Sequence, residues 1–190
     1  ESVIDVTEQV FYHCAMAVNG EPVIHYQGKT FDVTPPWRRI DMTDAVRDIT
    51  GVNFHEIDND DDARAAAIAY GMKAEDVADW TRGKIIAEMF EDYCEDGPGF
   101  LDGPVFVVGH PVEISPLAKR DSKDPRITRR FEGYINGWEV CNGFSELNDP
   151  IDQFERFAEQ QRQLDTGKDD EAHPMDMDFV NALEVGLPPT

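Results

Sequence analysis

Apolar residues recur every three or four positions along several stretches of the chain, and this spacing predicts amphipathic helices. The predicted helices cover residues 3–18, 44–50, 61–71, 75–95, 151–164 and 176–184. The stretch 75–95 is the longest of them, and its apolar stripe includes Val77, Trp80 and Phe90. We therefore expect helices to form a large part of the structure.

Shorter runs rich in β-branched and aromatic residues predict strands. These runs cover residues 23–26, 30–33, 38–40 and 104–108. The first two flank Gln27-Gly28-Lys29, which predicts a short hairpin. The run 104–108 is apolar almost throughout, as is typical of a strand that is buried on both faces.

The stretch 129–149 carries the clearest local pattern, a hairpin around Asn136-Gly137. An Asn-Gly pair supplies the two positive φ angles of a type I′ turn. A two-residue loop would pair Ile135 with Trp138, Tyr134 with Glu139, Gly133 with Val140 and Glu132 with Cys141. Because side chains alternate across a strand, we expect Glu132, Tyr134, Glu139 and Cys141 on one face and Phe131, Ile135, Trp138 and Val140 on the other.

A third carboxylate, Glu146, lies seven residues after Glu139, so an unbroken strand would place the two on opposite faces. The glycine of Asn142-Gly143 offers a remedy, since glycine inside a strand often marks a bulge. A bulge before Asn142 would put Asn142, Phe144 and Glu146 on the side of Glu132 and Glu139. We therefore expect the register to break between Glu139 and Asn142.

These carboxylates allow two interpretations from the residues alone. The hairpin can simply be amphipathic, with solvated glutamates on its polar face. Alternatively, Glu132 and Glu139 are diagonal neighbours at roughly 7–8 Å between backbones, within reach of one shared cation. Carboxylate oxygens are the ligands that hard cations prefer.

The composition is that of a globular chain. Its 190 residues are 41% hydrophobic and suffice for one domain. The net charge of −22 excludes a general affinity for phosphate backbones. Three widely spaced cysteines fit a reducing compartment, no apolar run is long enough to span a membrane, and we expect a cytoplasmic protein.

Basic residues gather in one place. Six of the 17 lie within twelve positions, namely Lys119, Arg120, Lys123, Arg126, Arg129 and Arg130. They either pair with nearby acids or form a loop that meets phosphates or a polynucleotide end. The chain contains no Walker loop, GxGxxG or GxSxG motif, so the hairpin remains the main candidate site.

Several motifs stand out in the second half of the chain. They are Pro111-x-x-x-Ser115-Pro116-Leu117-Ala118, Arg130-Phe131-Glu132 and the run from Asn136-Gly137-x-Glu139 to Asn142-Gly143-Phe144-Ser145-Glu146-Leu147-Asn148-Asp149-Pro150. Together they closely resemble the class II lysyl-tRNA synthetases. The resemblance covers essentially the whole chain. It implies an α+β fold with the antiparallel sheet of the class II catalytic core, incomplete and flanked by helices. Residues 1–190 would be a partial catalytic domain, with a helical insertion at 56–98.

The resemblance also implies a function: lysine is activated with ATP to lysyl-adenylate and then transferred to the 3′ end of lysine tRNA. Glu132, Glu139 and Glu146 correspond to carboxylates of the magnesium site, and Glu139 also to an ATP-binding residue. Asn142, Phe144 and Glu146 correspond to the lysine pocket. Glu146 would then face the substrate ammonium, a charge-assisted contact.

The family's motif 1, motif 2 and anticodon-binding barrel would lie before Glu1, and its motif 3 after Thr190. We therefore expect this stretch alone to be unable to activate lysine, and the full-length protein to be a homodimer. Trp138 and Cys141 differ from the residues expected there. Two alternatives are a synthetase paralogue that lysylates an elongation factor and a non-catalytic module that binds a partner through its acidic surface.

Overall fold

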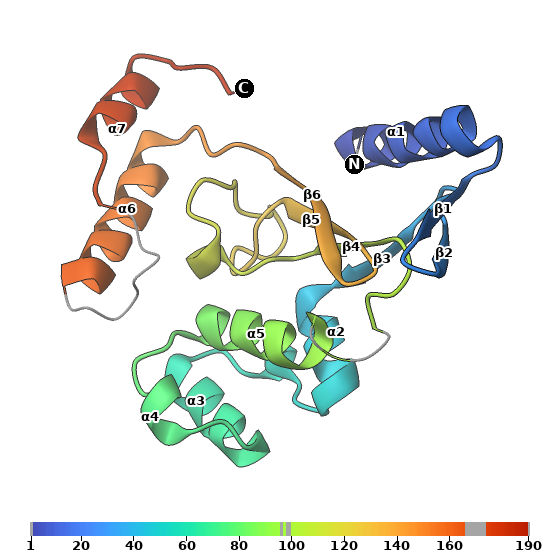
Figure 1. Cartoon of the computed structure of the whole chain (residues 1–190). Helices are drawn as coiled ribbons and strands as arrows, with labels where there is room; N and C mark the ends of the chain where they lie inside the picture. The colour runs from blue at the N-terminus through green and yellow to red at the C-terminus, as the bar shows by residue number, and fades with distance from the viewer. Residues whose placement is uncertain (1, 96, 98–99, 166–173, 190) are drawn as a thin grey trace.

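The computed structural model describes residues 2–95, 97, 100–165 and 174–189, and Figure 1 shows the chain. It has a four-stranded sheet in the order β3-β4-β5-β6 and a separate two-stranded hairpin, β1 and β2. The strands are β1 (Val23–Tyr26), β2 (Lys29–Asp32), β3 (Arg38–Asp41), β4 (Val105–Val108), β5 (Arg130–Ile135) and β6 (Trp138–Phe144). The predicted strands are thus confirmed.

The main sheet is antiparallel from β4 to β6, as expected, but β3 pairs with β4 in parallel. The predicted α+β fold with an antiparallel sheet is thus confirmed, and β3 joins the sheet as a parallel strand at one edge. The physical reason is the connection: the chain leaves β3, runs through several helices and returns in the same direction as β4. Such a long crossover is what a parallel pair requires.

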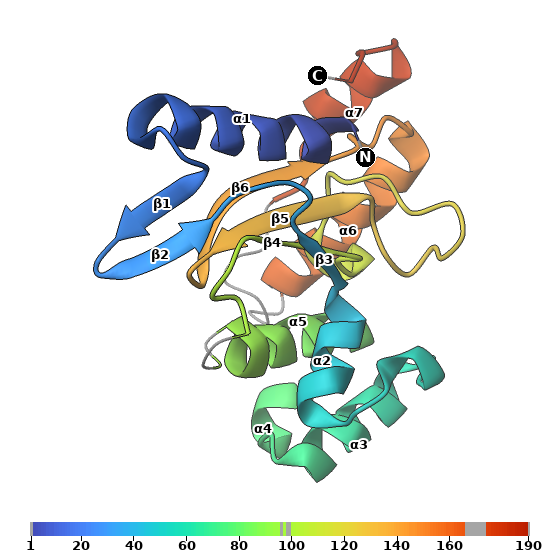
Figure 2. The same ribbon diagram turned by 90° about the vertical axis from the view of Figure 1, so that its right-hand side faces the viewer.

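Helices cover both faces of the main sheet (Figure 2). On one face α1 (Ser2–Asn19) packs through Ile4 and Ala15 in a cluster with Trp37, Phe106 and Phe131. On the other face lie α2 (Met42–Thr50) and α5 (Arg82–Phe90), in a cluster that contains Val105, Val107 and Tyr134. Because β4 is covered on both faces, all its residues can be apolar.

The long helix predicted over 75–95 is broken in the structure. It consists of α4 (Ala74–Val77), α5 and a π-helical turn, η2 (Glu91–Glu95). Thr81 starts α5 because its hydroxyl accepts a hydrogen bond from the Lys84 N–H at 3.2 Å. With η1 (Phe54–Glu56) and α3 (Asp60–Tyr70) this region is helical. That 56–98 is an insertion stays a prediction, and residues 96 and 98 lie outside the described chain.

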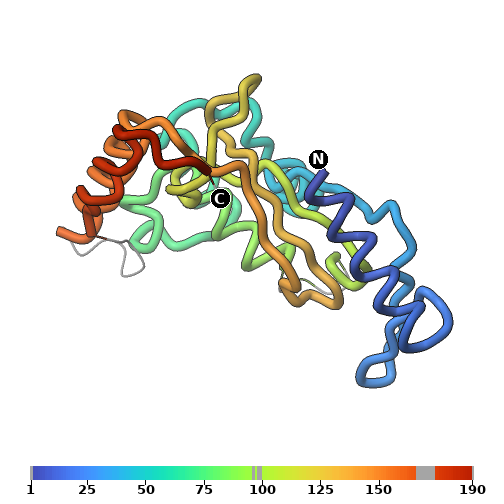
Figure 3. Tube along the Cα trace, turned by 90° about the horizontal axis from the view of Figure 1, so that it is seen from above, coloured from blue at the N-terminus to red at the C-terminus, as the bar shows by residue number. Residues whose placement is uncertain are grey.

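The C-terminal helices lie at the end of the molecule away from the β1–β2 hairpin (Figure 3). They are α6 (Pro150–Asp165) and α7 (Met177–Glu184). Arg156 of α6 is buried and donates to the carbonyls of Ser115 at 2.9 Å and Ala118 at 2.7 Å. It thereby fixes the segment that follows η3 (Val112–Ile114). No helix among the described residues has the length and apolar character needed to cross a membrane.

Candidate functional site

The β5–β6 hairpin turns as predicted. Asn136 and Gly137 have φ angles of 59° and 72°, the two positive values of a type I′ turn. The tip is fastened on both sides: the Asn136 N–H donates to the Asp102 carbonyl at 3.1 Å, and the Lys29 ammonium donates to the Asn136 side chain at 2.7 Å.

The register of the β5–β6 pairing shifts by one residue just after the pair formed by Tyr134 and Glu139. Ile135 faces Trp138 and Tyr134 faces Glu139, as predicted. Val140 is then the extra residue of a bulge, so Gly133 faces Cys141 and Glu132 faces Asn142. The predicted pairs of Gly133 with Val140 and Glu132 with Cys141 are therefore wrong. The predicted break between Glu139 and Asn142 is confirmed.

The bulge decides which side chains share a face. Beyond it, Asn142 and Phe144 lie on the side of Glu132 and Glu139, because directly opposite residues point the same way. Cys141 moves to the opposite face, where it packs against the cluster under α1. The expectation that Cys141 lies beside Glu132 is thus corrected. Gly133 makes this possible, since a Cβ there would collide with the Cys141 thiol.

Glu146 is held in line with the strand by a second short ladder. It forms an isolated antiparallel bridge with Ala118. On either side, the Lys119 N–H donates to the Ser145 carbonyl at 2.7 Å and the Leu147 N–H to the Leu117 carbonyl at 2.8 Å. Alternation along this extended segment puts Glu146 on the side of Asn142 and Phe144.

Glu132 is the buried member of this face, with 8% of its surface exposed. Its Oε2 accepts a hydrogen bond from the Tyr134 hydroxyl at 2.7 Å, and the Arg130 guanidinium binds its Oε1. The His110 Nε2 lies 3.2 Å from Oε2. Burial alone would raise the pKa of Glu132, but His110, Arg130 and Tyr134 outweigh it and lower the pKa to about 2. The carboxylate is therefore ionised at neutral pH.

Glu139 lies on the same face as Glu132, and the negative charge of Glu132 changes its pKa. Partial shielding from solvent raises the pKa of Glu139, and repulsion from Glu132 raises it further. Two carboxylates that repel each other across a partly solvated face are relieved by a cation between them. Arg130 and His110 already counter this repulsion in part, since both act to lower the pKa of Glu139.

The three glutamates do not form a closed metal cage. Within the described chain, the group of three ligand side chains whose atoms lie within 4.8 Å of one another is Asp41, Asp44 and His55. Those residues have structural roles, since Asp41 caps α2 and Asp44 pairs with Arg47 at 2.6 Å. An open set of hard oxygen donors nevertheless fits Mg²⁺, which is usually bound by one or two carboxylates together with substrate phosphates and water.

Comparison with known proteins decides the family. The model of the class II tRNA synthetases of the D, K and N group matches residues 1–190. The chain belongs to this family. Curated relatives include lysine–tRNA ligases from Thermoanaerobacter sp. (strain X514), 50% identical over 188 residues, and from Clostridium kluyveri and Syntrophomonas wolfei, each 46% identical over 189 residues. The alignments cover 99%, 99% and 100% of this chain, but only 36%, 37% and 37% of those proteins.

Sequence reasoning missed the contacts that three residues make with Glu132. Strand alternation placed Tyr134 on the face of Glu132 without indicating the contact, and it could have placed Arg130, two positions before Glu132, on that face as well. No pattern in the sequence pointed to His110, which lies 22 residues upstream, at the end of a neighbouring strand. Its approach to Glu132 follows from the β4–β5 pairing, in which Val107 faces Glu132.

The basic residues of this synthetase domain pair mostly with acids. Ion pairs join Arg120 to Asp152, Arg126 to Asp124 and Asp58, Arg129 to Asp121 and Arg130 to Glu132. This supports the first of the two interpretations for the four arginines. For Lys119 and Lys123 no ion pair is found within the described part of the chain, and phosphate binding by these two lysines stays a prediction.

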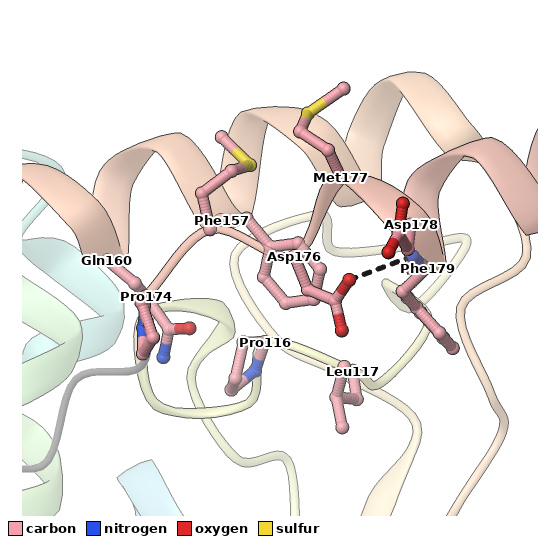
Figure 4. Close-up of a pocket in the computed structure, with 10 residues that line it drawn as sticks. Pro116, Leu117, Phe157, Gln160, Pro174, Asp176, Met177, Asp178 and Phe179 are labelled. Atoms are coloured by element: carbon pink, nitrogen blue, oxygen red, sulfur yellow. Dashed lines mark hydrogen bonds between the residues drawn. The ribbon is translucent and has the colours of Figure 1, made fainter.

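A groove of about 680 Å³ lies apart from the predicted residues, between α6, the start of α7 and the loop at Pro116 and Leu117 (Figure 4). Phe157 and Phe179 form part of its wall, and Asp176 caps α7 by accepting from the Phe179 N–H at 2.9 Å. None of the five predicted site residues lines it. The groove is thus separate from the candidate site on β5 and β6.

Proposed function

We propose that this chain is the part of a lysine–tRNA ligase that carries the lysine pocket and the carboxylates of its ATP–magnesium site. The observation that carries the proposal is the bulge at Val140, which aligns Glu132, Glu139, Asn142 and Phe144 on one face and continues that face to Glu146. Relatives named lysine–tRNA ligase, up to 50% identical across nearly the whole chain, support the same reaction.

In this proposal the lysine substrate lies over the β6 end of the face. Glu146 accepts hydrogen bonds from the substrate ammonium, and a charge-assisted contact of this kind selects a cationic side chain. Phe144 is 44% exposed and offers an apolar surface to the substrate's aliphatic stem. Asn142, also exposed, supplies both an amide donor and an acceptor.

Glu132 and Glu139 would hold Mg²⁺ next to the ATP phosphates, with Glu139 also contacting ATP and Glu146 contributing to the metal site. When bound, the ion would neutralise negative charge on the phosphates. The contribution of this chain is to keep Glu132 ionised and fixed, and to keep Glu139 close enough to share its cation. Both tasks are supported by the pKa directions of the two groups.

The whole reaction requires more than this stretch. We propose that the full-length gene product is a homodimer that uses lysine, ATP and lysine tRNA, and that residues 1–190 alone do not activate lysine. Lysylation of an elongation factor is less favoured, because the relatives are named as tRNA ligases. A non-catalytic acidic module is less favoured because the carboxylates converge on one face.

The test is amino-acid-dependent ATP–pyrophosphate exchange by the full-length gene product. Because the family covers three amino acids, lysine, aspartate and asparagine are compared at equal concentration. We expect exchange with lysine and none above background with the other two. Charging of lysine tRNA, with a purified elongation factor as the competing acceptor, then distinguishes the ligase from the paralogue. Exchange with aspartate or asparagine, or no exchange at all, would contradict the proposal.

A further inference from the structure

Three side chains hold the carboxylate of Glu132. Tyr134 donates its hydroxyl to Oε2 at 2.7 Å, and the His110 Nε2 approaches the same oxygen at 3.2 Å. Arg130 binds the other oxygen, Oε1. Tyr134 and His110 are 2% and 1% exposed, so water does not compete freely for these contacts.

Two of the three partners, Arg130 and His110, are themselves held by hydrogen bonds to neighbouring segments. The Arg130 Nη1 donates to the Ile114 carbonyl at 3.0 Å and to the Ser115 hydroxyl at 3.1 Å. The main-chain carbonyl of His110 accepts hydrogen bonds from the backbone N–H and the hydroxyl of Thr128. Glu132 therefore cannot rotate its carboxylate without breaking contacts that are anchored elsewhere.

The Glu132 carboxylate has more hydrogen-bond acceptor positions than these three side chains fill. An ionised carboxylate has about four lone-pair positions, two on each oxygen. Tyr134 occupies one of the two on Oε2 and the His110 ring lies against that oxygen, whereas Arg130 occupies only one on Oε1. One position on Oε1 remains for an external partner.

We infer that Tyr134 and His110 are positioning residues that reserve Oε2, so that Glu132 binds a divalent cation through Oε1 alone. The inference rests on the proposed role of Glu132 as a magnesium ligand and adds the residues that aim it. Partners that orient a metal ligand typically change metal affinity by about 10–100-fold when they are removed. Replacing Tyr134 by Phe deletes one hydroxyl and leaves the ring that packs in the core.

Mn²⁺ titration of the full-length gene product, followed by electron paramagnetic resonance, tests this directly. Mn²⁺ is the probe for the magnesium site, and the dissociation constant is compared for the wild type, Glu132→Gln, Tyr134→Phe, His110→Phe and His110→Gln. The matched control is Tyr93→Phe, which removes the hydroxyl of a half-buried tyrosine that packs against Tyr70. Thermal unfolding of every variant is recorded alongside.

We expect Tyr134→Phe and His110→Phe to weaken Mn²⁺ binding by about 10-fold, His110→Gln to restore part of the loss through its amide N–H, and Tyr93→Phe to bind like the wild type. If Glu132→Gln weakens binding but Tyr134→Phe and His110→Phe do not, the positioning inference is overturned and the proposed metal site stands. If Glu132→Gln binds Mn²⁺ as tightly as the wild type, both are overturned. Tyr134→Phe decides the matter even if the histidine variants do not fold.

Discussion

Glu132 lies directly opposite Asn142 across the β5–β6 ladder. In a regular hairpin built on the same turn it would face Cys141, and Asn142 would point to the other face. One extra residue, Val140, therefore brings a buried carboxylate and an exposed amide to the same side of the sheet. The proposed metal and lysine sites depend on this single irregularity.

The charge of Glu146 should govern the affinity for lysine. In the full-length gene product, Glu146→Gln is expected to raise the KM for lysine by roughly 10–100-fold, because a hydrogen bond to a charged group contributes about 1.5–3 kcal/mol. The KM for ATP should change less, because Glu132 and Glu139 remain at the proposed metal site. Initial rates of lysine-dependent exchange measure both constants, with Glu155→Gln, at an exposed position of α6, as the control. Equal shifts in both KM values would argue against a specific lysine contact.

Gly133 should be required because the Cys141 thiol occupies the space of its missing side chain. Gly133→Ala is expected to destabilise the protein by about 1–3 kcal/mol through overpacking against Cys141 and the Phe106 ring. A Cys141→Ala background should relieve part of that loss. Urea unfolding measures the free energies, and Gly103→Ala is the control, since a Cβ there meets nothing within 4 Å. If the losses of unfolding free energy from Gly133→Ala and Cys141→Ala simply add in the double variant, the added methyl group does not contact the Cys141 thiol.

Glu132 should make stability depend on pH. Its pKa in the folded protein is about 2, below the ordinary 4.5, so its ionised form stabilises the fold. This contribution is fully present above about pH 4.5 and is lost as the pH falls toward about 2. The difference in unfolding free energy between the wild type and Glu132→Gln, on the order of 3 kcal/mol at neutral pH, should shrink over that range. If the difference in unfolding free energy between the wild type and Glu132→Gln stays constant from neutral pH to about pH 2, the ionised Glu132 does not stabilise the fold.

Arg156 should be a structural anchor of the segment that carries Ala118, the bridge partner of Glu146. Arg156→Ala removes the side-chain donor to the Ala118 carbonyl and one of two donors to the Ser115 carbonyl, and is expected to cost about 2–4 kcal/mol. Arg156→Lys should recover little, because one ammonium cannot reproduce the planar fork. Arg162→Ala, at an exposed position of the same helix, should change stability by less than about 0.5 kcal/mol. Full recovery by lysine would show that charge alone matters.

Much of the fold was predictable because its signals are local. The Asn136-Gly137 turn and the apolar run of β4 follow from the preferences of a few neighbouring residues. The sequence predicted one helix over 75–95, because its apolar stripe is continuous. The start of a new helix at Thr81 depends on a single hydroxyl that caps it, and the apolar pattern does not show this cap. The parallel pairing of β3 with β4 was also missed, since it depends on the path through the intervening helices.

The candidate site was predictable in part for the same reason. The odd spacing of Glu139 and Glu146 suggested a register break if both share a face, and the glycine of Asn142-Gly143 located it between Glu139 and Asn142. The position of the extra residue, Val140 rather than a later one, depends on the close packing of Cys141 over Gly133. The contact between His110 and Glu132 joins two strands that are distant in sequence, so no local pattern indicates it.

Insertion of one alanine between Cys141 and Asn142 in the full-length gene product tests the central claim most directly, with lysine-dependent ATP–pyrophosphate exchange as the measurement. The added residue takes the position opposite Glu132, so alternation moves Asn142 and Phe144 to the other face of the sheet. We predict that the insertion lowers exchange by at least about 100-fold while circular dichroism shows a folded protein, and that Val140→Ala keeps near wild-type exchange. Exchange close to wild type in the insertion variant would contradict the account of how this site is assembled.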